Sequence, residues 1–137
     1  MNRTTIMLSA ILALFVFGLL KSEQSELFPS IAWSPDQITV AVFNGNGGRG
    51  MAGRTKTYLQ EYGFQVSAIG NAETFEYKTT VVIVLSEEAK VQVLLQDLPA
   101  TAEIVTPEEF NPHYDALAVF IPPGTDAVLI VGAGWPL

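Results

Sequence analysis

The chain has 137 residues and a formal net charge of −7, with an isoelectric point near 4.5. This length predicts one folded domain, and the acidity excludes the basic stripe that nucleic-acid binding requires. Because cysteine is absent, disulfides, thiolate metal sites, a cysteine nucleophile and a lipidated cysteine are excluded as well.

Residues 1–21 predict an N-terminal signal anchor, a single transmembrane helix. The run from Thr4 to Leu20 carries no charge, and as a helix it would span roughly 25 Å, which is at the short end of what crosses a membrane. Arg3 would keep the N-terminus cytoplasmic and leave the C-terminal domain periplasmic, outside the cytoplasmic membrane. Two alternatives stay open, a cleaved export signal and a buried core helix.

Residues 22–37 are polar, are broken by two prolines and predict a linker. Residues 38–137 then predict one α/β domain with a modest core. We expect a small domain of two or three layers, with a mixed sheet of about four to five strands, a βαβ unit and a second helix.

The βαβ unit comes first. Residues 38–43 are apolar and rich in β-branched side chains, which is typical of a strand buried on both faces. A glycine-rich loop, residues 44–50, leads to an amphipathic helix over residues 51–62 and an alternating strand over residues 64–69. We expect these two strands to be parallel. The apolar stripe of the helix consists of Ala52, Thr55, Tyr58, Leu59 and Tyr62.

A third strand is predicted over residues 79–85, since valine and isoleucine dominate there. Ser86 is expected to cap a second helix, whose apolar positions run from Val91 to Leu98 and which ends before Pro99.

The remaining pattern is weaker. Residues 103–105 predict a short strand and residues 106–115 an irregular segment. Of the two closing apolar runs, residues 116–121 and 127–131, only the second predicts a strand.

The glycine-rich loop contains Gly45-x-Gly47-x-x-Gly50, the spacing of a dinucleotide fingerprint between a strand and a helix. Gly70-Asn71-Ala72 follows the second strand where an acidic ribose ligand should lie, and the chain is too short for a full dinucleotide-binding sheet. A small phosphate- or nucleotide-binding enzyme using Gly45–Gly50 therefore remains only an alternative.

A simpler anion site is the leading hypothesis for this loop. Arg49, Arg54 and Lys56 are three of only five basic residues from residue 38 onward, against eleven acidic ones. Bare amides at a helix start beside these cations would attract an anion. The alternative is that the glycines only make a tight turn. The candidate ligand-binding residues are Asn44, Gly45, Asn46, Gly47, Gly48, Arg49, Gly50, Arg54 and Asn71.

Catalytic residues are not predicted. His113 is the only histidine, which excludes a two-histidine metal site within one chain, so neither a metal nor a cofactor is expected. The acidic pairs at residues 87–88 and 108–109 are typical of helix starts or surfaces. An enzyme would have to use Glu73 and His113 near the loop.

The domain resembles the LytR C-terminal domain family, from about Ile38 to Trp135. The matching stretches are Val40-Ala41-Val42-Phe43-Asn44-Gly45-Asn46-Gly47 with Gly50, Leu59 with Gly63-Phe64-Gln65-Val66, Gly70-Asn71-Ala72, Tyr77-Lys78-Thr79-Thr80-Val81-Val82 and Val131-Gly132-Ala133-Gly134-Trp135. Gly134 stands where the family usually carries an acid, and the stretch from Thr101 to Thr125 is longer than the family pattern.

The resemblance implies an accessory module, found behind LytR-CpsA-Psr enzymes or alone in small membrane-anchored envelope proteins. We therefore expect a non-catalytic binding or scaffolding module of the bacterial cell envelope. Its partner would be an anionic wall polymer, a lipid carrier or an envelope protein.

Overall fold

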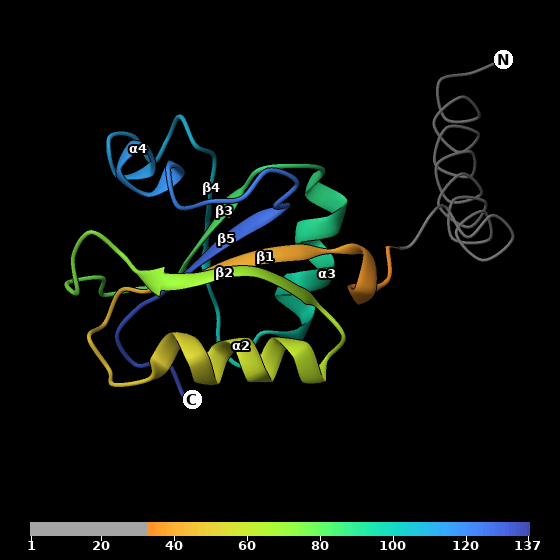
Figure 1. Ribbon diagram of the computed structural model, residues 1–137, viewed down its shortest axis with the longest axis horizontal. Coiled ribbons are helices and arrows are strands. Elements are labelled where there is room, and N and C mark those ends of the chain that lie inside the picture. The colour runs from red at the N-terminus through yellow and green to blue at the C-terminus, as the bar shows by residue number, and fades with distance from the viewer. Residues whose placement is uncertain (1–32) are drawn as a thin grey trace, which may run out of the picture. The chain divides into compact units, whose positions relative to one another are not determined.

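A five-stranded mixed sheet forms the centre of the part of the chain that the computed structural model describes, residues 33–137 (Figure 1). In chain order its elements are η1 (Pro35–Gln37), β1 (Thr39–Asn44), α2 (Met51–Glu61), β2 (Gln65–Asn71), β3 (Val81–Val84), α3 (Glu88–Asp97), β4 (Glu103–Val105), α4 (His113–Ala118) and β5 (Ala127–Val131). The strand order is β2-β1-β5-β3-β4, and only β5 and β3 run antiparallel. The predicted mixed sheet of about four to five strands is confirmed.

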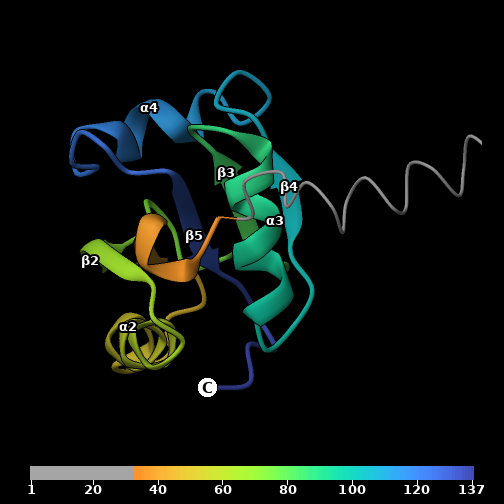
Figure 2. The ribbon, with the colours of Figure 1, turned by 90° about the vertical axis from the view of Figure 1, so that its right-hand side faces the viewer.

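The sheet has a helical layer on each face. Helices α2 and α3 cover one face, and α4 with its flanking segments lies on the other (Figures 1 and 2). Strand β1 contributes to both apolar clusters, because successive side chains of a strand point to opposite faces. Val40 and Val42 belong to the α2/α3 cluster, whereas Ala41 and Phe43 belong to the α4 cluster.

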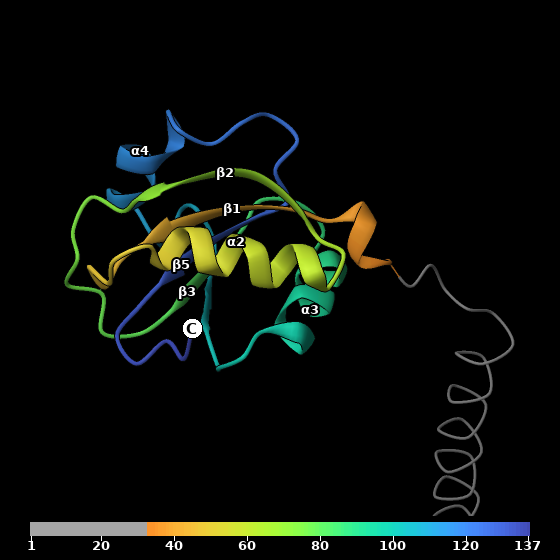
Figure 3. The ribbon, with the colours of Figure 1, turned by 60° about the horizontal axis from the view of Figure 1, so that its bottom comes forward.

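The βαβ unit follows the prediction closely. Strands β1 and β2 are parallel neighbours. Helix α2 connects them in the chain and runs along one face of the sheet (Figure 3). The helix is followed by Gly63 with a φ of 95°, a conformation that glycine adopts readily. The predicted stripe extends one residue too far, because α2 ends at Glu61 and Tyr62 lies exposed beyond it.

Two local predictions need correction. Helix α3 begins at Glu88 with Glu87 as its N-cap, while Ser86 lies in the preceding turn with its hydroxyl 3.5 Å from the Asp126 carbonyl. The segment predicted to be irregular contains the start of α4. The apolar run 116–121 is divided, since Leu117 is buried whereas Val119 and Phe120 face solvent.

The predicted anchor at residues 1–21 and most of the predicted linker fall outside the described residues. Within residues 33–137, no helix is both long and apolar enough to cross a membrane. Trp33, near the end of the predicted linker, packs against the α2/α3 cluster.

Candidate functional site

The loop between β1 and α2 is held by the side chain of Asn44, the last residue of β1. Its Oδ1 accepts hydrogen bonds from the amides of Asn46 and Gly47, both at 3.1 Å. Its Nδ2 donates to the carbonyl of Gly48 at 2.8 Å. A short amide side chain that bonds to the backbone two or three residues ahead closes a turn of this kind. Asn44 is thus a structural cap of the loop.

Asn46 repeats the arrangement and extends it to the C-terminal strand. Its Oδ1 accepts from the amide of Gly48 at 2.7 Å, and its Nδ2 donates to the carbonyl of Gly132 at 2.9 Å. The amide of Gly45 donates to the carbonyl of Val131. Four consecutive loop amides, those of residues 45–48, are therefore satisfied within the protein. The expectation of bare main-chain donors is wrong for this part of the loop.

The start of α2 retains its two cationic side chains. Gly50 is the N-cap in the left-handed conformation, and no side chain caps the helix there. Arg54 donates from Nη1 to the carbonyl of Arg49 at 2.6 Å, and both arginines are exposed. Asn71 is the register partner of Asn44, as expected for the ends of two parallel strands. What the loop still offers an anion is the two exposed guanidinium groups, while Asn71 is exposed at the end of the neighbouring strand.

Two glycines are required here for space. A Cβ atom on Gly45 would lie 2.7 Å from Tyr77 and 2.9 Å from the Val131 carbonyl. One on Gly132 would lie 2.3 Å from the backbone of Thr79, closer than any real Cβ contact. Gly45, the first glycine of the spacing that resembles a dinucleotide fingerprint, is therefore needed for close packing. It lies between the segment at Tyr77 and the end of β5.

The C-terminal tail crosses the helical layer beside this loop. Trp135 is buried, and its Nε1 donates to Thr55 Oγ1 in α2 at 3.1 Å. Thr55 in turn donates to the carbonyl of Met51. The amide of Gly132 donates to Thr80 Oγ1 at 3.0 Å. The C-terminal tail therefore bonds to α2 and to the loop after β1, beside the ends of β1 and β5.

Glu73, Tyr77 and His113 form an acid–base cluster at the surface. Glu73 Oε1 accepts from the Tyr77 hydroxyl at 2.5 Å and lies 2.8 Å from His113 Nδ1. Burial raises the pKa of Tyr77 well above its usual range, and the bond to Glu73 adds to this, so the hydroxyl keeps its proton. The phenyl ring of Phe110 lies between the two rings, with centroids 6.1 Å from Tyr77 and 5.4 Å from His113.

This cluster contains the two residues that an enzyme would have to use, and the fold does bring them together. The His113 side chain is 55% exposed, however, and neither Glu73 nor His113 lines the groove at the end of β3. Among residues 33–137, no group of three or more acidic or histidine side chains could hold a metal ion. The geometry is that of a link between the segment before β3 and the segment around α4.

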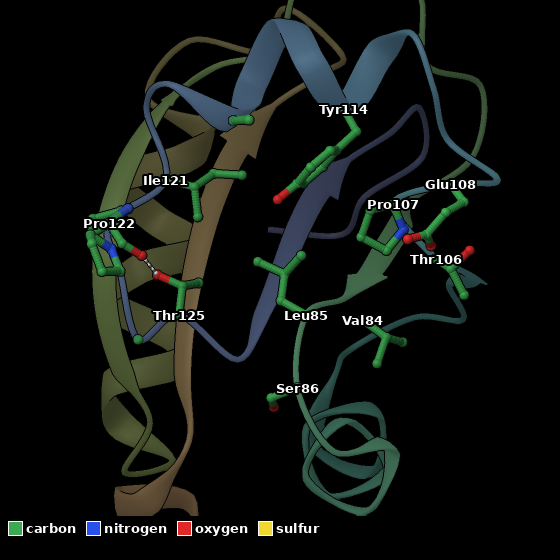
Figure 4. A pocket seen from close by; sticks show the side chains of 13 residues that line it. Val84, Leu85, Ser86, Thr106, Pro107, Glu108, Tyr114, Ile121, Pro122 and Thr125 are labelled. Atoms are coloured by element: carbon green, nitrogen blue, oxygen red, sulfur yellow. Dashed lines mark hydrogen bonds between the residues drawn. The ribbon is translucent and has the colours of Figure 1, made fainter.

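A broad, open groove lies elsewhere, at the opposite end of β1 from the glycine-rich loop. Figure 4 shows this groove, which encloses about 620 Å³ between the end of β3 and the segment 106–125. Its lining is Val84, Leu85, Ser86, Thr106, Pro107, Glu108, Tyr114, Ala118, Ile121, Pro122, Pro123, Gly124 and Thr125. We refer to it as the β3 groove.

The chemistry of the β3 groove is mixed and nearly uncharged. Tyr114, Leu85 and Ile121 supply apolar surface, and Figure 4 shows Tyr114 and Ile121 turned toward one another across it. Ser86 and Thr106 add hydroxyl groups that can donate and accept hydrogen bonds. Glu108 is the only ionisable carboxylate among the lining residues. The exposed lining is thus at least as polar as it is apolar, a mixture that can contact both the apolar faces and the hydroxyl groups of a ligand.

Sequence reasoning missed these groove residues. They carry no motif, and ten of the thirteen lining residues belong to the stretch Thr101–Thr125. This stretch contains α4 and the Pro-rich turn before β5.

Comparison with known protein families shows where this domain belongs. The family model described as LytR cell envelope-related transcriptional attenuator matches residues 37–135. The chain belongs to this family, the LytR C-terminal domain family. No curated protein and no solved structure matches the chain.

Family membership places the chain among cell-envelope proteins. Domains of this family are extracellular parts of envelope proteins and are generally accessory and non-catalytic. The chain is accordingly a cell-envelope-associated module.

Proposed function

We propose that this chain is an extracytoplasmic, non-catalytic binding module of the cell envelope and that its ligand lies in the β3 groove. One observation carries the proposal: the β3 groove is a broad concave surface that combines apolar side chains with hydroxyl groups and contains no acid–base pair. Such a surface binds and orients a ligand, whereas general acid–base catalysis needs titratable groups within reach of the reacting atoms.

The ligand that fits is an uncharged, hydroxyl-bearing chain, such as the sugar segment of a wall glycopolymer. Tyr114, Pro107 and Ile121 would contact the apolar faces of sugar rings, while Ser86 and Thr106 would exchange hydrogen bonds with ring hydroxyls. The Glu108 carboxylate disfavours phosphate at this place because like charges repel.

A second candidate surface is the glycine-rich loop with Arg49, Arg54 and Asn71. The observation that favours it is the adjacent exposed pair of arginines on an otherwise acidic domain. Because the amides of residues 45–48 are already bonded within the protein, this surface would bind an anionic polymer or a lipid phosphate only through the two guanidinium groups and Asn71. Its contribution should fall steeply with ionic strength.

The test measures how tightly the full-length protein binds one probe, the polysaccharide fraction of a solubilised bacterial envelope, and compares variants of the two surfaces. Ser86 is exposed and contacts only Asp126 through its hydroxyl, so Ser86→Trp should fill the groove without disturbing the buried apolar clusters. We expect Ser86→Trp to weaken binding by about tenfold, equal to ~1.4 kcal/mol. Gln60→Trp, on the exposed side of α2, is the matched control and should bind like wild type.

The double substitution Arg49→Ala with Arg54→Ala separates the two surfaces. Loss of binding only at low salt would assign the anionic part of the ligand to the loop. Normal binding by Ser86→Trp would contradict the groove proposal. Hydrolysis of the probe by wild type but not by His113→Ala would instead support the alternative of an enzyme.

A further inference from the structure

A second concave surface lies at the other end of β3, where that strand begins. It is a hollow of about 420 Å³ between residues 78–80, residues 100–103, which lead into β4, and residues 133–135 of the C-terminal tail. None of its lining residues belongs to the β3 groove. Small-molecule sites usually enclose about 300–1,000 Å³, so the hollow is large enough for a small ligand. We refer to it as the Lys78 cleft.

Main-chain hydrogen bonds hold the three walls of the Lys78 cleft together. The amide of Ala133 donates to the carbonyl of Tyr77, and the amide of Glu103 donates to the carbonyl of Thr80, both at 2.8 Å. The buried ring of Trp135 belongs to the same lining. The shape of the cleft is therefore fixed by the protein itself, which lowers the entropic cost of binding a ligand.

Lys78 gives this cleft a positive charge that the β3 groove lacks. It is the only basic residue in the lining, and its side chain is exposed. Two ion pairs occur within residues 33–137, and neither includes Lys78. An ammonium group that the acidic side chains of this unit leave unpaired can form a charge-assisted hydrogen bond with a carboxylate of a ligand.

Glu103 supplies the opposite charge in the same lining, and it too is absent from both ion pairs. Glu103 is the register partner of Val81, and Lys78 lies three residues before Val81. With about 3.4 Å per residue along a strand and about 4.8 Å between strands, the two Cα atoms lie roughly 11 Å apart or less. One small molecule can therefore reach both charges.

The charges around Lys78 select the kind of ligand. An adjoining hollow of about 530 Å³ extends from Lys78 to Phe75 and Glu76, so two carboxylates lie around one ammonium group. A doubly charged phosphate is disfavoured here, because both carboxylates would repel it. A molecule with one carboxylate and one ammonium group matches the cleft, since each of its charges finds an opposite one.

We propose that the Lys78 cleft binds a short peptide with two free ends, its carboxylate at Lys78 and its amino group at Glu103. An extended chain spans about 3.3–3.6 Å per residue, so a tripeptide covers roughly 10–11 Å, close to the separation of the two residues. Thr79 and Thr101, both exposed in the lining, carry hydroxyl groups that can bond to the peptide groups. This site does not depend on the ligand of the β3 groove.

The probe that tests this site is trialanine, titrated into the full-length protein in a calorimeter. Its C-terminal amide, its N-acetyl form and inorganic phosphate are titrated in parallel. We expect trialanine to bind, and we expect the loss of either end charge to weaken binding by about fivefold or more, since each loss removes a charge-assisted contact. Phosphate should bind more weakly than trialanine.

Two substitutions assign the two ends of the peptide, and both are at exposed residues. Lys78→Met should bind trialanine and its amide equally, because the group that contacts the carboxylate is gone. Glu103→Gln should bind trialanine and its N-acetyl form equally. Lys56→Met and Glu61→Gln remove like charges from α2, outside the cleft, and as matched controls they should discriminate among the probes like wild type.

Three results would overturn the proposal. The first is the absence of trialanine binding by wild type, and the second is tighter binding of phosphate than of trialanine. The third is discrimination that does not follow the assigned residues: Lys78→Met still prefers the free carboxylate, or Lys56→Met loses that preference as well. The last outcome would mean that the peptide senses only the overall charge of the domain.

Discussion

At the scale of single residues, the glycine-rich loop is held by two asparagines that each bond to the backbone ahead. Asn44 and Asn46 satisfy the loop amides and fasten the loop to the carbonyl of Gly132. A motif that suggests an anion cradle is therefore a packed junction between β1, β5 and the tail. The same residue types serve both roles, and only the side-chain directions distinguish them.

Gly132 gives the sharpest stability prediction at this scale. Gly132→Ala would place a Cβ atom 2.3 Å from the Thr79 backbone, which cannot move like a flexible side chain. We expect a loss of about 1–3 kcal/mol in the free energy of unfolding, as is typical of overpacking.

Gly53→Ala is the matched control for that change. Nothing lies within 4 Å of a Cβ atom there, and Gly53 lies inside α2, so alanine should stabilise the domain by up to about 1 kcal/mol. Urea denaturation of both variants measures the two effects. Equal stability of Gly132→Ala and wild type would contradict the junction described here.

At the scale of elements, the segment around α4 is joined to the rest of the domain by apolar packing and by a polar contact at the surface. Leu117 packs into the core, and His113 reaches Glu73 at the surface. The segment forms one wall of the β3 groove. The contacts that attach this segment should therefore help to keep the shape of the β3 groove.

His113→Ala should loosen this segment without unfolding the sheet. The lost contact is an exposed hydrogen bond, and a contact of this kind contributes about 1 kcal/mol or less, which corresponds to at most roughly fivefold faster amide exchange. Hydrogen exchange should show this acceleration over residues 106–121 and none in α2. His113→Gln, which can still donate to Glu73, should exchange nearly like wild type. Acceleration spread evenly over the domain would show that His113 has another role.

At the scale of the whole molecule, Asp126 ties the beginning of the domain to its last strand. Its carboxylate accepts from the amide of Thr39 at 2.8 Å and from Lys90 Nζ at 3.1 Å. Lys90 lies 4.5 Å from the ring centre of Trp33. Burial alone would raise the pKa of Asp126, but the hydrogen bonds and the positive charge of Lys90 outweigh it and lower that pKa.

This lowered pKa predicts acid sensitivity. The folded pKa lies below the unfolded value of about 3.9, so the stabilisation is complete above that pH and is lost as the pH falls through the folded pKa. Asp126→Asn should reduce the free energy of unfolding by about 1–3 kcal/mol at pH 7, and this difference from wild type should shrink toward pH 2. A difference that stays constant down to pH 2 in denaturant titrations would refute the role of the carboxylate charge.

Much of the fold could be predicted because it depends on local patterns. The apolar strands β1 and β5, the period of α2 and the turn at Gly63 are all decided by neighbouring residues. Helix α4 could not be predicted, since its six residues carry too few apolar positions to show a period. The β3 groove was missed for a related reason: its lining residues come from four separate stretches and share no motif.

The sequence by itself determined the order of the strands along the chain, the parallel βαβ unit, the helix after β3 and the membership of an envelope family, because each follows from short-range pattern and residue order. The tertiary structure decided the fate of the glycine-rich loop, the meeting of Glu73 with His113, and which residues line the β3 groove. These depend on where side chains and strands far apart in the chain come to lie, and the free energy of those contacts exists only once the sheet has formed.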